Sequence, residues 1–267
     1  MNVALKSKNI EDVEKTGFYS EMKVVNKFLN YKCDCDVSVG YFDKDENKSR
    51  EIDLSASLLN SKKDILSEKE ILTGIHFLIE IKKNEHPWIV FKANDQKWWK
   101  TMDSQTICNI INLKIKENDL RNLLSKNTLI SKLDWIGYGI HECFKKPDSH
   151  SRWYSSFVSV VKACEDIGRR KWLIPNTINK SLIIVKPVVI LDGEIVLAEL
   201  TKENKLKISE IPYCIIDFYY KSDNYTREKY RIELVSLKAL EDYLSLYQKF
   251  GDALNNFVCF ADNKSPT

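Results

Sequence analysis

Two short segments carry the residue types that could do chemistry, and both have the alternation of a β-strand. They are residues 50–54, Arg-Glu-Ile-Asp-Leu, and residues 78–82, Leu-Ile-Glu-Ile-Lys. Side chains alternate along a strand, so Asp53 lies opposite the apolar face of the first segment, while Glu80 and Lys82 share one face of the second, about 6.6 Å apart. If the two strands are neighbours, Asp53, Glu80 and Lys82 converge.

Two carboxylates on one sheet face repel each other unless a cation lies between them. Oxygen ligands from one or two carboxylates, completed by water, are what Mg²⁺ prefers, and Mn²⁺ is the alternative. A divalent ion held there can lower the pKa of a bound water and stabilise the charge that develops on a phosphodiester, while the Lys82 ammonium orients the attacking water. The residues therefore predict metal-dependent hydrolysis of a nucleic-acid backbone.

The order Asp53, then Glu80-Ile81-Lys82, resembles the D…ExK signature of the PD-(D/E)xK nuclease superfamily, which includes restriction endonucleases. The family often carries an acidic residue on the helix before these strands, and Glu21 occupies that place. The resemblance implies Asp53, Glu80 and Lys82 as catalytic residues, and Glu21, Asp53, Glu80 and the Ile81 carbonyl as metal ligands. It implies Mg²⁺ or Mn²⁺ as the cofactor.

The resemblance covers residues 17–92 well, including the strand Pro-Trp-Ile-Val-Phe at 87–91, and residues 187–200 loosely. Ile52 stands where the motif has proline, and no QxxxY element is found. The resemblance favours DNA over RNA as substrate and a bacterial restriction or defence system as the setting. A homodimer is compatible with cutting both strands of a duplex, and a partner subunit of a larger system is also compatible.

The pattern of the chain predicts one α/β domain over residues 1–267, with its catalytic core at about 14–92. We expect a restriction-endonuclease-like core, a mixed β-sheet flanked by helices, and a C-terminal β-hairpin and helix extension. Helices are expected at 13–29, 153–170 and 237–250, and the first should be regular from about Phe18. One or two further helices are expected within 104–133. Strands are expected as a hairpin over 37–59, at 75–82, 87–91, 182–185 and 187–191, as a hairpin with 194–198 through Asp192-Gly193, and at 213–219 and 230–235.

Composition excludes several classes of function. Lys plus Arg total 41 against 38 for Asp plus Glu, a net charge of +3, which disfavours a purely electrostatic nucleic-acid binder. No apolar run is long enough to span a membrane, and no signal-peptide pattern is present, so we expect a cytoplasmic protein with no membrane partner. The seven cysteines are scattered like free thiols. Rossmann, P-loop, nucleophile-elbow and zincin signatures are missing.

Other interpretations remain open at this point. The chain could be a catalytically idle member that binds nucleic acid or a partner protein, or an unrelated α/β domain in which the signature is a coincidence. Glu51 either joins the site or pairs with Arg50 or Lys48. Lys83 is expected to point away from Lys82, and His86 to be a loop residue. The segments 97–100 and 169–172 interleave tryptophan with cations, as either a nucleic-acid groove or core residues would.

Overall fold

The computed structural model describes residues 3–63, 70–92, 107–145, 151–169, 178–225 and 227–263. Within them, eleven strands form one mixed sheet in the order β1-β2-β3-β7-β11-β10-β6-β4-β8-β9, and β5 pairs with β7. The strands are β1 (Asp34–Asp43), β2 (Lys48–Lys63), β3 (Glu70–Lys83), β4 (Trp88–Lys92), β5 (Ile107–Ile111), β6 (Gly137–Glu142), β7 (Ile178–Asp192), β8 (Ile195–Leu200), β9 (Leu206–Ile211), β10 (Tyr213–Tyr219) and β11 (Lys229–Ser236).

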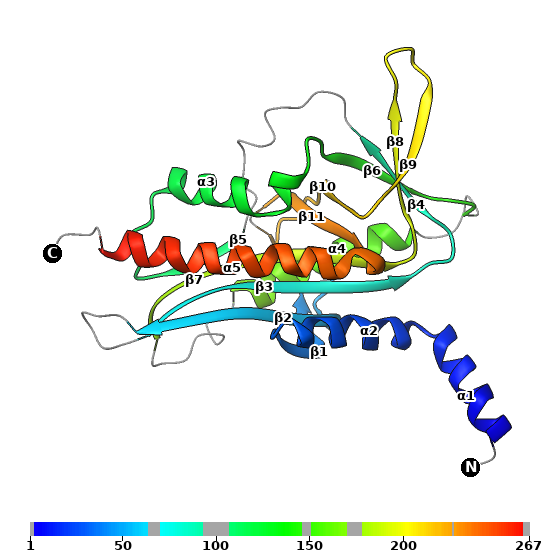
Figure 1. Cartoon of the computed structure of the whole chain (residues 1–267), viewed down its shortest axis with the longest axis horizontal. Coiled ribbons are helices and arrows are strands. Elements are labelled where there is room, and N and C mark those ends of the chain that lie inside the picture. The colour runs from blue at the N-terminus through cyan, green and yellow to red at the C-terminus, as the bar shows by residue number, and fades with distance from the viewer. Residues whose placement is uncertain are drawn as a thin grey trace.

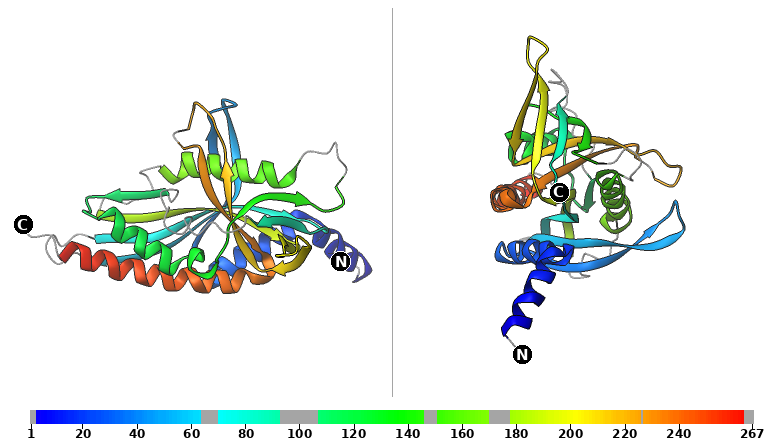
Figure 2. Two further views of the ribbon diagram at one scale, coloured as in Figure 1. Left: turned by 90° about the horizontal axis from the view of Figure 1, so that it is seen from above. Right: turned by 90° about the vertical axis from the view of Figure 1, so that its right-hand side faces the viewer.

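Helices cover both faces of this sheet, as predicted for an α/β chain. They are α1 (Val3–Lys15), α2 (Gly17–Asn30), α3 (Glu117–Asn127), α4 (Arg152–Asp166) and α5 (Leu240–Asn263), with short 3₁₀ helices at Leu129–Lys132, Ile167–Arg169 and Leu237–Ala239. Helices α2 and α5 lie on one face, with α3 packed on α5, and α4 lies on the other (Figures 1 and 2). The β8–β9 hairpin projects from the body of the molecule (Figure 1).

Strand β7 is the centre of the sheet because three strands share its two edges. It runs parallel to β3 along almost its whole length, while its other edge pairs with β5 over Ser181–Val185 and then with β11 over Val188–Leu191. Pro187 lies between these two partners. The ladder on this edge is interrupted there, so a residue without an N–H is tolerated in a central strand. Residues 182–191 were predicted as two strands and form one.

The predicted hairpin through Asp192-Gly193 is wrong, because β7 and β8 do not pair. Strand β8 instead runs parallel to β4, just as β7 runs parallel to β3. The two connections pass side by side: the Asn84 N–H donates to the Asp192 carbonyl at 3.1 Å. A Cβ on Gly193 would lie 2.5 Å from the Asn84 carbonyl oxygen. Glycine is therefore required at position 193 because two backbones approach closely there, and not because the chain makes a tight hairpin turn.

Several other predictions can be compared with the structure. The β1–β2 hairpin, β3, β4, β10, β11 and the helix α4 are confirmed, and the 13–29 helix is divided at Thr16, so that α2 begins at Gly17. The middle region was predicted as helix only, yet it contains β5 as well as α3. Strands β6 and β9 were not predicted, and α5 extends well beyond residue 250.

An aromatic cluster joins α2 and α5 to the sheet. The Phe77 ring of β3 contacts Phe28 of α2 at 5.6 Å and Tyr247 of α5 at 5.3 Å, both edge to face. All three are fully buried. Tyr31, just after α2, donates its hydroxyl hydrogen to the Glu241 carbonyl of α5 at 3.1 Å. These contacts fix α2, which carries Glu21, against the strand that carries Glu80.

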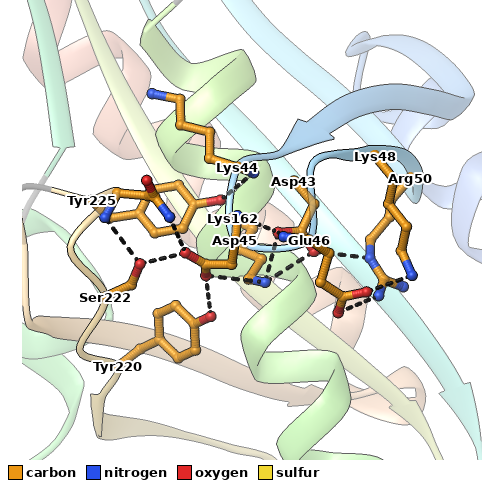
Figure 3. A network of polar contacts seen from close by, with 11 residues as sticks. Asp43, Lys44, Asp45, Glu46, Lys48, Arg50, Lys162, Tyr220, Ser222 and Tyr225 are labelled. Carbon is orange, nitrogen blue, oxygen red and sulfur yellow. Dashed lines mark hydrogen bonds and ion pairs between the residues drawn. The ribbon is translucent and has the colours of Figure 1, made fainter.

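A buried ion pair attaches the β1–β2 hairpin to the opposite helix. Lys162 of α4 is 4% exposed and donates to both carboxylate oxygens of Asp43, at 2.7 and 2.9 Å. Asp43, at 1% exposure, also accepts from the Arg50 guanidinium at 2.9 Å. Asp45, in the hairpin turn, accepts from Lys162 and from Tyr220, Ser222 and Asn224 (Figure 3). We call these residues the hairpin network: Asp43, Asp45, Arg50, Lys162, Tyr220, Ser222 and Asn224.

None of the helices described is both long and apolar enough to cross a membrane. The tryptophan segment 97–100 lies outside the described residues, as do residues 170–172 of the second such segment.

Candidate active site

Asp53 and the Glu80–Lys82 segment meet at the end of the β2–β3 ladder. The last paired residues of this antiparallel ladder are Leu54 and Ile79, so the next step along each strand brings Asp53 beside Glu80. The Asp53 carboxylate accepts the Ile81 backbone N–H at 2.7 Å and the Lys82 ammonium at 3.3 Å, both on Oδ2. The side chain of Asp53 thus replaces a ladder bond at this position, which holds its carboxylate in place.

Glu80 lies deepest in this group. It is 6% exposed, and its Oε2 is 2.6 Å from the Lys82 Nζ. Burial nevertheless raises the pKa of Glu80 to about 7, because removal of the carboxylate from water outweighs the attraction of Lys82, and Asp53 adds repulsion. The pKa of Lys82 is raised as well: burial alone would lower it, and the two carboxylates reverse that effect. The site therefore has more negative charge than Lys82 alone balances.

Glu21 faces the same group from α2. The preceding residue, Ser20, is buried and donates its hydroxyl hydrogen to the Asp192 carboxylate at the end of β7, which anchors this turn of α2. Burial raises the pKa of Glu21, the charge of Asp53 raises it further, and Lys82 opposes both. Glu21 is therefore electrostatically coupled to Asp53 and Lys82, two of the three residues that the D…ExK pattern identifies.

A cavity of about 640 Å³ opens beside this group, and Glu21, Ile81 and Lys82, but neither Asp53 nor Glu80, are among its lining residues. Lys82 both lines the cavity and contacts Asp53 and Glu80, so it connects the cavity to the deeper carboxylates. The lining includes four cations, Lys15, Lys82, Lys83 and Arg152, against the two carboxylates Glu21 and Glu85. An excess of cations around a few acidic groups suits an anionic substrate.

The structure brings together the residues that sequence reasoning selected. Lys82 contacts both Asp53 and Glu80, and the Ile81 N–H donates to Asp53. Glu21 shares the cavity with Lys82, whereas Asp53 and Glu80 do not line it. Glu51 is exposed and lies outside the cavity lining, while Arg50 and Lys48 pair with other acids. Across the described ranges, no three side chains of the usual ligand types form a cluster that could hold a metal ion.

Sequence analysis did not predict most of the lining residues as part of the site, among them Lys15, Lys83, His86 and Arg152. Lys83 was expected to point away from Lys82 into solvent, yet it lines the same cavity and donates from Nζ to the Glu14 carbonyl at 2.6 Å. Arg152 comes from α4, 99 positions beyond Asp53. The only available signal was its positive charge at the start of a helix, which does not indicate which site the helix approaches.

The raised pKa of Glu80 predicts a pH-dependent stability in the absence of divalent ions. Between pH 4.5, the ordinary pKa of Glu80, and about pH 7, its pKa in the folded chain, the folded chain retains a proton that the unfolded chain releases. The stabilisation is complete below about pH 4.5 and is lost as pH rises through about 7, on the order of 3 kcal/mol in all. Urea unfolding in EDTA should show that wild type loses this stability relative to Glu80→Gln over that range.

His76 has the opposite effect on the change of stability with pH, because burial lowers its pKa to about 4. Its contribution to stability is complete above its ordinary pKa of 6.5 and is lost as pH falls through about 4. Since both proteins contain His76, its contribution cancels in the difference between wild type and Glu80→Gln. A difference that stays constant with pH would contradict the assigned burial of Glu80.

Comparisons of the chain with protein-family models, with curated proteins and with solved structures gave no significant match.

Proposed function

We propose that this chain is a divalent-metal-dependent nuclease that hydrolyses phosphodiester bonds of nucleic acid, with Asp53, Glu80 and Lys82 as its catalytic residues. The observation that carries the proposal is the contact of one lysine with two carboxylates from neighbouring strands, at 3.3 Å and 2.6 Å. The cationic cavity beside them supports an anionic substrate. The D…ExK pattern of the sequence resembles that of restriction-endonuclease-like proteins, and this resemblance favours DNA over RNA.

The chemistry of these groups fits a hard divalent cation. Asp53 and Glu80 offer oxygen ligands from adjacent strands, and a buried carboxylate with a raised pKa is one that a cation would stabilise. By resemblance, the Ile81 carbonyl and Glu21 complete the ligand set. Because no three side chains form a closed cluster in the described residues, further oxygens from water and substrate are needed, as is usual for Mg²⁺. Such an ion supplies an activated water and neutralises phosphoryl charge.

The protein's own groups have distinct tasks in this proposal. The Ile81 N–H and Lys82 hold the Asp53 carboxylate in one orientation. Lys82, which lines the cavity, has one ammonium hydrogen beyond its contacts with Asp53 and Glu80 with which to orient a water molecule or contact a phosphoryl oxygen. Positive charge placed in advance where negative charge develops lowers the barrier without reorganisation. Lys15, Lys83 and Arg152 would hold the flanking phosphates.

The test is cleavage of labelled single-stranded DNA, duplex DNA and RNA in Mg²⁺, Mn²⁺ or EDTA. We expect metal-dependent cutting of at least one substrate by wild type and its loss in Glu80→Gln. Glu51→Gln is the matched control, since it removes an exposed carboxylate from β2 near Asp53 and should cut like wild type. Cutting that persists in Glu80→Gln would contradict the assigned site. Absence of cutting, with metal binding retained, would favour a catalytically idle binding module.

A further inference from the structure

Phe144 lies two residues after β6 and has two features that folding alone does not explain. Its side chain is 83% exposed, the largest fraction among the exposed large apolar residues of the described chain. Its φ is +55°, in the left-handed region, where a bulky side chain is strained. A water-exposed ring and a strained backbone both oppose folding. Strain of this kind persists at sites where function requires a particular geometry.

The position of Phe144 relates it to the candidate active site. Its ring contacts the imidazole of His86 edge to face, with centroids 5.3 Å apart and planes at 74°. His86 lines the same cavity as Glu21 and Lys82. Phe144 therefore stands next to the cavity, supported on one side by His86, with most of its surface open to solvent.

The charges around the cavity indicate what kind of molecule could lie against this ring. Lys15, Lys83 and Arg152 line the cavity together with Lys82 and outnumber its two carboxylates. Cations in a groove bind successive phosphates, and an exposed aromatic ring beside them stacks on a base. Bases inside a duplex are covered on both faces by their neighbours, so a duplex must unstack before it can use such a ring. An unpaired base meets the ring without that cost.

We propose that Phe144, supported by His86, is a stacking platform for an unpaired base, and that the candidate site takes single-stranded nucleic acid in preference to duplex. The inference rests on the proposed nuclease function and adds the strand preference to it. The phosphates on either side of the stacked base would lie along Lys15, Lys83 and Arg152, which brings the backbone over Lys82.

Fluorescence anisotropy in EDTA, with labelled oligonucleotides of about 12 nucleotides, measures binding separately from cleavage. We expect wild type to bind the single strand more tightly than the matching duplex. Phe144→Asn should weaken single-strand binding by about 5- to 100-fold and leave duplex binding unchanged. Phe144→Trp keeps an aromatic face and should bind within a few-fold of wild type.

Asparagine tolerates the left-handed backbone, so Phe144→Asn should unfold at the wild-type temperature or above it. A lower unfolding temperature would mean that Phe144 serves folding and would overturn the proposal. Tyr138→Ala is the matched control, because Tyr138 is a 64% exposed aromatic residue of β6 outside the cavity lining, and its loss should not change binding. Arg152→Ala should reduce the slope of log affinity against log salt by about 0.7, whereas Phe144→Asn should leave it unchanged.

The outcomes separate this inference from the proposed function. If wild type cleaves nucleic acid but Phe144→Asn binds single strands as well as wild type does, the stacking platform is wrong and the nuclease stands. If wild type binds duplex as tightly as single strand, the strand preference is wrong. If single strands bind through Phe144 but no metal yields cleavage, the nuclease fails while the binding surface remains.

Discussion

Replacement of Lys82 by methionine is expected to lower kcat for nucleic-acid cleavage by about 10²- to 10³-fold, with KM within a few-fold of wild type. Lys82 is the one cation in contact with both Asp53 and Glu80 among the described residues, and it lines the cavity where the substrate would lie. Methionine keeps a long, unbranched side chain but removes the charge. Steady-state cleavage of a labelled oligonucleotide in Mg²⁺ measures both parameters.

Lys83→Met is the matched control, since it removes the same charge one position further along β3. Lys83 lines the cavity but donates to the Glu14 carbonyl, so its loss should affect KM more than kcat. Lys82→Arg should recover only part of the rate, because a planar guanidinium does not fit the place of an ammonium between two carboxylates. A Lys82→Met protein with wild-type kcat would contradict the assigned role.

Lys162→Met is expected to lower the free energy of unfolding by up to about 3–5 kcal/mol, the effect of breaking a buried ion pair, because Asp43 then keeps only the partly exposed Arg50 as a charged partner. Asp43, 1% exposed, would lose its two hydrogen bonds to the ammonium, and Asp45 would lose a third contact (Figure 3). In a chain of this size such a change corresponds to a fall in Tm of about 6–20 °C. Thermal unfolding followed by circular dichroism measures it.

Two companion variants show whether the buried charge is the cause. Lys48→Met removes an exposed ion pair of the same hairpin, between Lys48 and Glu46, and should cost less than about 1 kcal/mol. Asp43→Asn in the Lys162→Met background removes a buried charge that Arg50 alone then compensates, and it keeps an acceptor for Arg50, so it should recover part of the lost stability. If Lys162→Met and Lys48→Met had equal effects, the hairpin network would not be a major source of stability.

Local patterns predicted the elements whose contacts are close in sequence. The β1–β2 hairpin, β3 and the amphipathic helix α4 follow from alternation, from a polar turn and from a period of three to four residues. The Asp192-Gly193 pair misled the prediction, because the same two residues occur in hairpin turns and where two backbones approach closely. The partner in this case, Asn84, is more than a hundred positions away, so no local pattern could reveal it.

The same distinction applies to the candidate site. The alternation of side chains along two strands was enough to predict that Asp53, Glu80 and Lys82 share one face. The pairing of Leu54 with Ile79 in the β2–β3 ladder places them side by side. The cavity beside them depends on tertiary packing. Arg152 lines the cavity from the first residue of α4, which packs on the face of the sheet opposite α2. Ser20 anchors α2 by its hydrogen bond to Asp192 of β7. These contacts join elements that are far apart in the sequence, so local periodicity does not reveal them.

The most direct test of the proposed nuclease site is the single-turnover rate of cleavage as Mn²⁺ is titrated, with enzyme in excess over a labelled oligonucleotide. We predict no cleavage in EDTA and a rate for wild type that rises to saturation with Mn²⁺. Glu80→Gln, which keeps the shape of the buried side chain and loses its charge, should show no cleavage at any Mn²⁺ concentration. Equal saturating rates for the two proteins would contradict a metal-dependent site at Asp53 and Glu80.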